Sequence, residues 1–199
     1  MRRILVWTIF VVCIVSCSTQ KSTAATNENK NLLDSKQESL RISERLVLPH
    51  HLKNTGALSR EIVKIDEPSG LRVKYSAPRL TSSSIFVQTL NEFTSEEKSI
   101  VAQAQYFAEA NVLNLRRQGV NNTFLLKECI TSKFSNTDVA YQRVIREDSN
   151  KVLHLYVTTI DQKIIFVQAW ADYQKESEGY KEKFDTFLND LIQDLEHQI

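Results

Sequence analysis

The sequence predicts a single α+β domain, in which an antiparallel sheet is covered by a long central helix and a C-terminal amphipathic helix. Three observations predict this class. Segments that alternate apolar and polar residues lie on both sides of one helical pattern. The second half of the chain has four such segments joined by short polar connections. A second apolar pattern, with a helical period, closes the sequence from Tyr180 to Leu195.

The first strands form a hairpin in this prediction. The segments Glu61–Ile65 and Leu71–Tyr75 flank Glu67-Pro68-Ser69-Gly70, which has the proline and glycine of a tight turn. Charged and apolar residues alternate along the second segment, so one face of the hairpin is expected to be buried and the other exposed. A third strand is predicted at Ser84–Leu90.

The central helix follows this third strand. Thr94 and Glu97 have the spacing of a capping box at its start. Arg116, Arg117 and Gly119 are favourable residues at its end. Its core-facing side is predicted from apolar residues at helical spacing, namely Val101, Ala104, Phe107, Ala108, Val112 and Leu115.

Four further strands are predicted, at Thr123–Thr131, Val139–Arg146, Val152–Thr159 and Lys163–Ala171. Asp148-Ser149-Asn150 and Asp161-Gln162 are short polar connections, so the last three strands should form an antiparallel meander. The closing helix should bury one side, made of Tyr180, Phe184, Phe187, Leu188, Leu191 and Leu195. Its charged residues fall mostly off that side: Glu182, Lys183, Asp185, Asp190 and Glu196.

This order of elements resembles the PsbP-like family, the sandwich fold of a photosystem II extrinsic protein. The resemblance covers about residues 45–195 and depends on the segment Gly70-Leu71-Arg72-Val73-Lys74-Tyr75-Ser76-Ala77-Pro78 and on the closing helix around Phe184 and Phe187. It implies a small α+β sandwich. It implies no particular activity, because that fold does not have a single one.

The first seventeen residues have the pattern of a secretion signal. Arg2 and Arg3 precede an almost unbroken apolar run from Ile4 to Val15. Twelve helical residues cover about 18 Å, which is well short of the roughly 30 Å of a bilayer's hydrocarbon core. The run therefore indicates a cleaved signal rather than a membrane span.

The end of this signal, Ile14-Val15-Ser16-Cys17, resembles the lipobox of bacterial lipoproteins. The resemblance implies a diacylglyceryl group on the Cys17 sulfur and cleavage before Cys17 by signal peptidase II, with acylation of the new amino group in many bacteria. Two or three acyl chains anchor a protein stably in a membrane. The alternative is an ordinary signal peptide in which Cys17 is incidental.

The resemblance also implies which membrane holds the anchor. In Gram-negative lipoproteins an aspartate after the cysteine favours retention in the inner membrane, and Ser18 stands there instead. We therefore expect the outer membrane, on its periplasmic side, in a Gram-negative host. In a Gram-positive host the anchor would lie in the outer face of the cytoplasmic membrane.

The full chain is predicted to have three parts. Residues 1–16 are the signal peptide, residues 17–41 are the lipidated cysteine and a flexible tether, and residues 42–199 are one globular domain. The tether is polar apart from Leu32-Leu33, so it cannot bury enough apolar surface to offset the entropy of ordering it. It should hold the domain roughly 25–30 Å from the membrane.

Charge and cysteine content exclude several functions. The 199 residues include 25 Lys and Arg and 24 Asp and Glu, and removing Arg2 and Arg3 with the signal leaves 23 basic residues against 24 acidic ones. A nearly neutral chain predicts no nucleic-acid partner. Cys129 is the single cysteine left beside Cys17, so no intramolecular disulfide is available, and a buried, inert thiol is the expected state of Cys129.

Motifs for nucleotides, catalysis and metals are absent from the sequence. The four glycines lie at least fourteen residues apart, which excludes a phosphate-binding loop, a dinucleotide fingerprint and a hydrolase elbow. His50-His51 have no third ligand nearby, so we expect neither a metal site nor a cofactor. His154 is predicted to be a packed or hydrogen-bonded core residue, and His197 to end the last helix.

Other candidate residues also have structural explanations. The pairs Glu96-Glu97 and Glu176/Glu178 lie where helix starts and loops are expected, so capping and solvation account for them. Four aromatic residues on the meander could form a stacking platform for sugars or peptides, although a packed sheet face explains them better: Tyr141, Tyr156, Phe166 and Trp170.

The leading hypothesis is a membrane-anchored interaction or assembly protein of the cell envelope, with an envelope protein as its partner. Its working surface would be an exposed sheet face or a sheet edge. The alternative is a module that binds a lipid, a peptide or a glycan in a pocket between sheet and helix. An enzyme would need scattered residues such as His154 and Cys129 to converge, so we do not expect catalysis.

Overall fold

The computed structural model describes residues 40–65, 70–81, 83–91, 99–120, 123–172 and 179–199. Its centre is one nine-stranded sheet in which every pair of neighbouring strands is antiparallel, in the order β1-β2-β3-β4-β9-β8-β7-β5, with β6 also paired to β7. The strands are β1 (His51–Leu52), β2 (Ala57–Ile65), β3 (Gly70–Ser76), β4 (Ile85–Asn91), β5 (Phe124–Leu126), β6 (Ile130–Phe134), β7 (Thr137–Arg146), β8 (Lys151–Ile160) and β9 (Lys163–Asp172).

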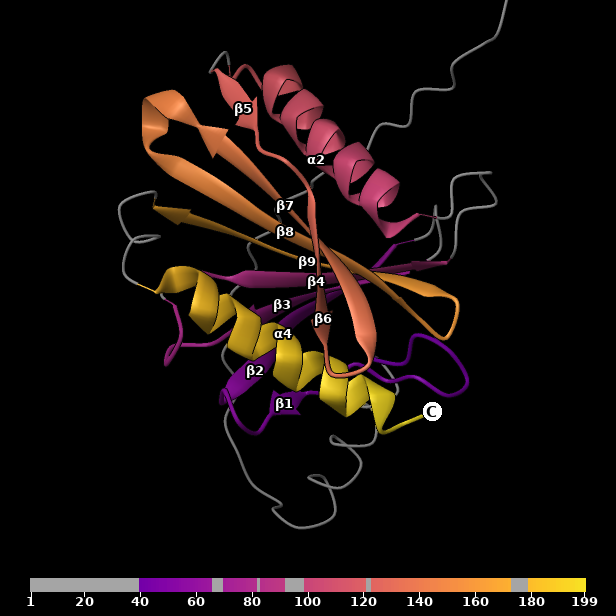
Figure 1. The fold of residues 1–199 in the computed structure, drawn as a ribbon. Helices are drawn as coiled ribbons and strands as arrows, with labels where there is room; N and C mark the ends of the chain where they lie inside the picture. The colour runs from indigo at the N-terminus through magenta and orange to yellow at the C-terminus, as the bar shows by residue number, and fades with distance from the viewer. Residues whose placement is uncertain (1–39, 66–69, 82, 92–98, 121–122, 173–178) are drawn as a thin grey trace, which may run out of the picture.

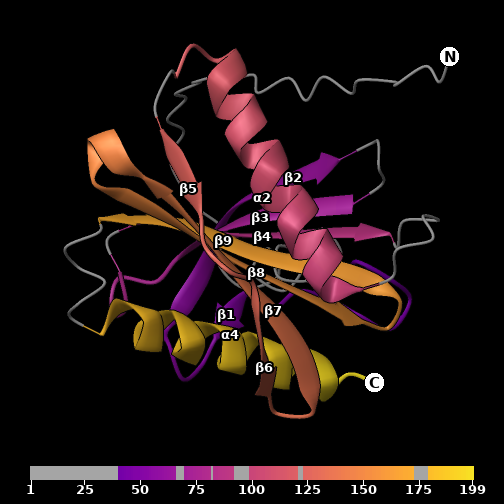
Figure 2. The ribbon, with the colours of Figure 1, turned by 45° about the horizontal axis from the view of Figure 1, so that its top comes forward.

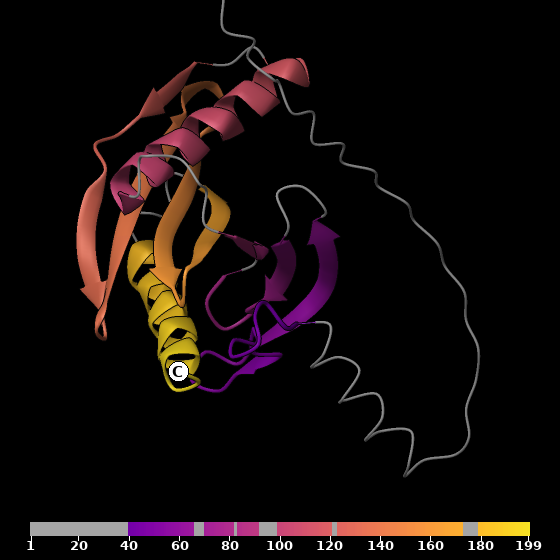
Figure 3. The same ribbon diagram turned by 90° about the vertical axis from the view of Figure 1, so that its right-hand side faces the viewer.

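The predicted arrangement, a sheet covered by a long central helix and a C-terminal helix, is wrong. The sheet curls into a half-barrel, and the helix α4 (Tyr180–Glu196) lies inside the curl, between β6–β8 on one side and β1–β3 on the other (Figure 3). The other helix, α2 (Ile100–Arg117), packs on the opposite face, mainly over β7 and β8 (Figures 1 and 2). The protein is therefore mainly β. The right-handed twist of strands, which residue patterns do not show, accumulates over nine strands and bends the sheet round α4.

The curled sheet is buried on both faces where β7, β8 and β9 meet. One apolar cluster lies inside the curl against Phe184, Phe187 and Leu191 of α4. A second lies under α2 against Ala104, Ala108 and other residues of that helix. Strand β8 therefore has an almost continuous run of buried residues rather than an alternating one. The small alanines let α2 lie close to the sheet.

Most predicted strands are confirmed. Strands β2 and β3 pair as a hairpin from Ile65 and Gly70 outward, and β4 pairs with β3. Strands β7, β8 and β9 form the predicted meander. Asp161 and Gln162 form the tight connection between the last two strands, with φ of 47° and 60°, as in the two-residue turns that favour hairpins.

Two predicted elements differ from the structure. The single strand predicted at Thr123–Thr131 is two strands, β5 and β6, which pair with different parts of β7. The described part of α2 begins at Ile100 after Ser99, which makes no side-chain cap. The predicted capping box of Thr94 and Glu97 lies outside the described residues.

Segments from the two ends of the described chain meet inside the curl. Leu40, the first described residue, is already fully buried in the core with Leu46 and Leu48. The side chain of Gln198 accepts a hydrogen bond from the backbone of Val47 at 2.8 Å and donates one back to it at 3.0 Å. The start of the domain is thus fixed to the end of α4. Among the described residues, neither helix has the length and hydropathy required to cross a bilayer.

Candidate functional site

The predicted lipidation site lies outside the part of the chain that the structure describes. Cys17, the lipobox residues before it and the predicted tether up to residue 39 all belong to the undescribed segment. The carboxylate pairs Glu96-Glu97 and Glu176/Glu178 lie outside the described residues as well. The anchor therefore stays a prediction, and the site has to be sought on the folded domain.

Cys129 was predicted to lie in a strand, but it lies in the short break between β5 and β6. Its thiol is free and half-buried, and it packs against the apolar cluster under α2. Burial raises the pKa of the Cys129 thiol, which disfavours the thiolate that a nucleophile needs. The residue has the properties of an inert packing group.

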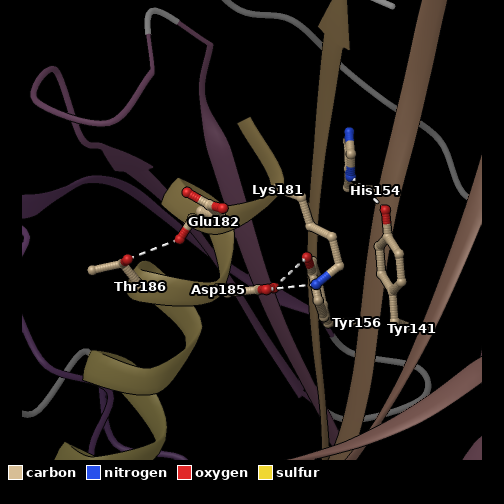
Figure 4. A network of polar contacts seen from close by, with 7 residues as sticks. All are labelled: Tyr141, His154, Tyr156, Lys181, Glu182, Asp185 and Thr186. Atoms are coloured by element: carbon tan, nitrogen blue, oxygen red, sulfur yellow. Dashed lines mark hydrogen bonds and ion pairs between the residues drawn. The ribbon is translucent and has the colours of Figure 1, made fainter. Parts of the chain in front are cut away.

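His154 is a core residue, as predicted. It is fully buried on β8, and its Nδ1 lies 2.8 Å from the hydroxyl of Tyr141 on β7 (Figure 4). Burial is the main reason that its pKa falls from 6.5 to about 4, and the charges of Arg143 and Lys181 lower it further, partly opposed by Asp185. The imidazole is therefore neutral at physiological pH.

A polar network continues from the His154–Tyr141 pair to the surface of α4 (Figure 4). The Tyr156 hydroxyl donates to Asp185 Oδ1 at 2.9 Å, and Lys181 Nζ lies 2.5 Å from Asp185 Oδ2. The same Lys181 nitrogen is 5.4 Å from the centre of the Tyr141 ring. These contacts tie the first turns of α4 to β7 and β8, which makes the network a structural link between helix and sheet.

The structure does not bring the residues of the enzymatic hypothesis together. His154 faces α4, whereas Cys129 packs on the other face of the sheet, under α2. His51 is exposed on β1, and His50 Nδ1 contacts the hydroxyl of Ser59. Within the described ranges, no three His, Cys, Asp or Glu side chains are grouped closely enough to hold a metal ion.

The four meander aromatics do not form one stacking platform. Tyr141 and Tyr156 face α4, where their rings stack with 4.6 Å between centroids. Phe166 and Trp170 lie on the opposite face with α2, and Phe166 contacts the Phe107 ring at 4.0 Å. The expectation that these rings pack in the core is confirmed for Tyr141, Tyr156 and Phe166, while Trp170 is partly buried.

One edge of the sheet is apolar and exposed, and the sequence did not locate it. We call it the β5–β6 edge: it consists of β5 and β6, which lie end to end along β7. Three of its side chains are unusually exposed for their type: Leu125 at 39%, Leu126 at 37% and Ile130 at 45%. No strand among the described residues pairs with the outer side of β5 or β6. Apolar side chains on an open edge are rare, because such edges promote association.

The hydrogen-bond pattern shows which backbone groups this edge offers. Lys127 N donates to Arg143 O at 3.0 Å, and Glu147 N donates to Thr123 O at 3.2 Å. Residues 123, 125 and 127 therefore bond inward to β7. In an antiparallel ladder the alternate residues bond to the other side, so the backbone groups of Phe124 and Leu126 point outward. These groups can pair with a further strand.

A β-bulge separates β5 from β6. Lys127 lies opposite Arg143 and Ile130 opposite Tyr141, so Glu128 and Cys129 together face the single residue Gln142. The buried Gln142 side chain donates to the carbonyl of Lys127, which a regular ladder would have paired with β7. The register change is thus held by a specific side chain.

Comparison with known proteins gives no family for this chain. No protein-family model matches it, and no curated protein is significantly similar to it. The resemblance to the PsbP-like family accordingly stays a prediction.

Proposed function

We propose that this protein is a lipid-anchored protein of the bacterial cell envelope that binds a partner protein through its β5–β6 edge. The observation that supports the proposal best is the open edge itself, with the exposed side chains of Leu125, Leu126 and Ile130. The lipobox pattern at Ile14–Cys17 supports the anchor. Ser18 supports the outer membrane, facing the periplasm, in a Gram-negative host.

The partner element is an extended segment that adds to the sheet as a strand. Main-chain hydrogen bonds supply affinity in this mode of recognition, and alternate side chains supply specificity. The outward backbone groups of Phe124 and Leu126 are suited to it. The bulge at Glu128 and Cys129 limits regular pairing to a short stretch on either side, so the contact should be compact and reversible.

Charge divides the β5–β6 edge into two halves. The apolar half includes β5 and Ile130. In the other half Lys133 is strongly exposed and lies 4.0 Å from Asp138 of β7. Charged side chains, lysine above all, protect natural edge strands from unwanted pairing. The partner strand should therefore contact β5 and the beginning of β6, not the hairpin end.

A photo-crosslinking experiment in cells tests the edge. A photoreactive phenylalanine analogue is placed at Leu126 or Ile130, and at Val63 as a matched control. Val63 is also an apolar strand residue, and its exposure of 46% is close to the 45% of Ile130, but it lies on β2. We expect one discrete adduct of the same mass from positions 126 and 130 and none from position 63. Equal adducts from all three positions, or none, would contradict the edge as the interface.

The anchor has its own test. The wild type and Cys17→Ser are compared by intact mass and by membrane flotation. Acyl mass on the wild type and loss of membrane association in the variant are the expected results, because removal of the sulfur removes the attachment point. If both chains are cleaved, unacylated and soluble, the anchor is wrong, and the crosslinking result then decides the edge by itself.

A further inference from the structure

Strand β5 has no charged residue, although it lies at an open edge of the sheet. The opposite edge is different. Beyond its short pairing with β1, strand β2 exposes three charged side chains, those of Arg60, Glu61 and Lys64. Charged side chains on an edge strand prevent it from pairing with a second copy of itself. The described sheet therefore has this protection along β2 and lacks it along β5.

Two copies of β5 are complementary when they run antiparallel about a two-fold axis at Leu125. The backbone groups of Phe124 and Leu126 point outward, so Phe124 of each copy can bond to Leu126 of the other. The two Leu125 side chains, each 39% exposed, then lie directly opposite each other on one face of the joined sheet. On the other face Leu126 lies beside Phe124 of the second copy. Apolar side chains thus cover apolar side chains on both faces.

The charges next to β5 also match in this arrangement. Lys127 lies opposite Thr123 of the second copy, so the two lysines do not face each other. Glu147 borders Thr123 on the inner side, where its backbone N donates to Thr123 O at 3.2 Å. Lys127 of one copy and Glu147 of the other are therefore separated by a single strand, with about 10 Å between their Cα atoms. Their side chains can meet across the small Thr123, and the two-fold axis repeats this pair.

Lys127 and Glu147 cannot make this contact within one chain. Lys127 lies opposite Arg143, four residues before Glu147, so about 13 Å separates the two positions along the sheet. Neither residue makes an ion pair within the described part of the chain. Opposite charges that meet only across the two-fold axis favour a second copy over an arbitrary strand.

We propose that the partner at the β5–β6 edge is a second copy of this chain, which pairs β5 with β5 in an antiparallel arrangement centred on Leu125. This inference rests on the proposed function, because it names the occupant of the same edge. The interface is isologous, with the same surface used by both copies. It joins the two sheets into one continuous sheet.

Cysteine substitution in the full chain, in cells, tests the register of this pairing. The Cα atoms of the two Leu125 residues should be about 4.5 Å apart, a distance that a disulfide bridges. Those of the two Leu126 residues should be about 8 Å apart, beyond the roughly 7 Å limit for a disulfide. After mild oxidation of the envelope, Leu125→Cys should give a disulfide-linked dimer on a non-reducing gel, and Leu126→Cys about a tenth as much or less.

Leu126→Cys is a matched control, because Leu126 is 37% exposed and Leu125 is 39% exposed. Random collisions between copies would link both variants equally. The wild type, treated in the same way, shows how much the native Cys129 contributes to any dimer.

Charge reversal tests the ion pairs across the axis. In the Leu125→Cys chain, Lys127→Glu should lower the yield of linked dimer about fivefold, because each copy then places a glutamate near Glu147 of the other. Adding Glu147→Lys should restore the yield to within about twofold, because the charges are again opposite.

The proposal is overturned if Leu125→Cys gives no more dimer than Leu126→Cys, or if Lys127→Glu leaves the yield unchanged. The photo-crosslinking experiment separates this failure from failure of the proposed function. A discrete adduct between position 126 and a different protein, without the Leu125→Cys dimer, would leave the edge as the interface and exclude a second copy as its occupant. If neither experiment gives a product, both proposals are wrong.

Discussion

The imidazole of His154 lies parallel to the ring of Phe184, with 9° between the planes and 5.4 Å between the centroids. This contact joins the middle of the sheet to α4. Tyr180, from the previous turn of α4, lies against the same imidazole at 5.6 Å. A neutral imidazole suits this apolar stack, and a protonated one does not.

We therefore predict that acid destabilises the domain through His154. Its pKa in the folded state, about 4, is below the value of 6.5 for an unfolded chain, so the unfolded state binds the proton more readily between these values. The stabilisation is present above pH 6.5 and is lost as the pH falls towards 4. Urea unfolding should show a loss of about 2 kcal/mol from His154 between pH 7 and pH 5.

The variant His154→Phe separates this contribution from that of other titrating groups. It keeps an aromatic ring near Phe184 and cannot be protonated there. Its free energy of unfolding should fall less between pH 7 and pH 5 than that of the wild type, and the difference should be the about 2 kcal/mol assigned to His154. Identical pH profiles for the two chains would show that His154 does not titrate as proposed.

Asp190 is predicted to be essential for stability. Its carboxylate accepts hydrogen bonds from Asn54 Nδ2 at 2.8 Å, from Thr55 N at 3.1 Å and from Thr55 Oγ1 at 3.0 Å. Asp190→Ala leaves the two buried Thr55 donors without an acceptor and should cost about 2–4 kcal/mol in chemical unfolding. Glu182→Ala, which removes an exposed carboxylate from the same helix, should cost about 0.5 kcal/mol or less.

Phe187 should be among the most sensitive core positions. It is fully buried, and its ring meets that of Tyr75 edge to face at 5.6 Å. Phe187→Ala creates a cavity inside the curl and should lower the free energy of unfolding by about 3–5 kcal/mol. Leu113→Ala on α2, where the side chain is 49% exposed, serves as the comparison and should cost about 1 kcal/mol or less. Equal losses would mean that α4 is not packed as described.

Gly70 is predicted to resist substitution because of crowding rather than turn geometry. A Cβ atom at this position would lie 2.0 Å from the carbonyl oxygen of Thr89 on β4. Gly70→Ala must therefore push β3 and β4 apart, and should lower the free energy of unfolding by about 1–3 kcal/mol. Ser76→Ala, at the other end of β3, should have little effect. If Gly70→Ala left the free energy of unfolding unchanged, the two strands would be shown to separate easily at this position.

Local patterns predicted the elements of this fold well, because they depend on neighbouring residues. The alternation around Val73 and the polar pair Asp161-Gln162 were sufficient to place strands and a turn. The side of α4 that includes Phe184 and Phe187 was equally clear. The burial of Asp190, which falls mostly off the apolar side of the pattern, could not be predicted, because its partners Asn54 and Thr55 come from a distant segment.

Features that depend on pairing between distant strands could not be predicted. The break at Cys129 exists because β5 and β6 take different registers on β7, whereas the sequence around Cys129 has the pattern of one continuous strand. The exposure of Leu125 and Ile130 likewise follows from their place at the end of the sheet order, not from their own residue type.

The position of α4 inside the curl also has a consequence for biogenesis. Leu40, Leu46 and Tyr75 share one cluster with Phe184, Phe187 and Leu195, so the first-made strands have no filled interior until residues 180–195 have been synthesised. The strands that precede α4 therefore reach their packed state only after α4 itself has been made.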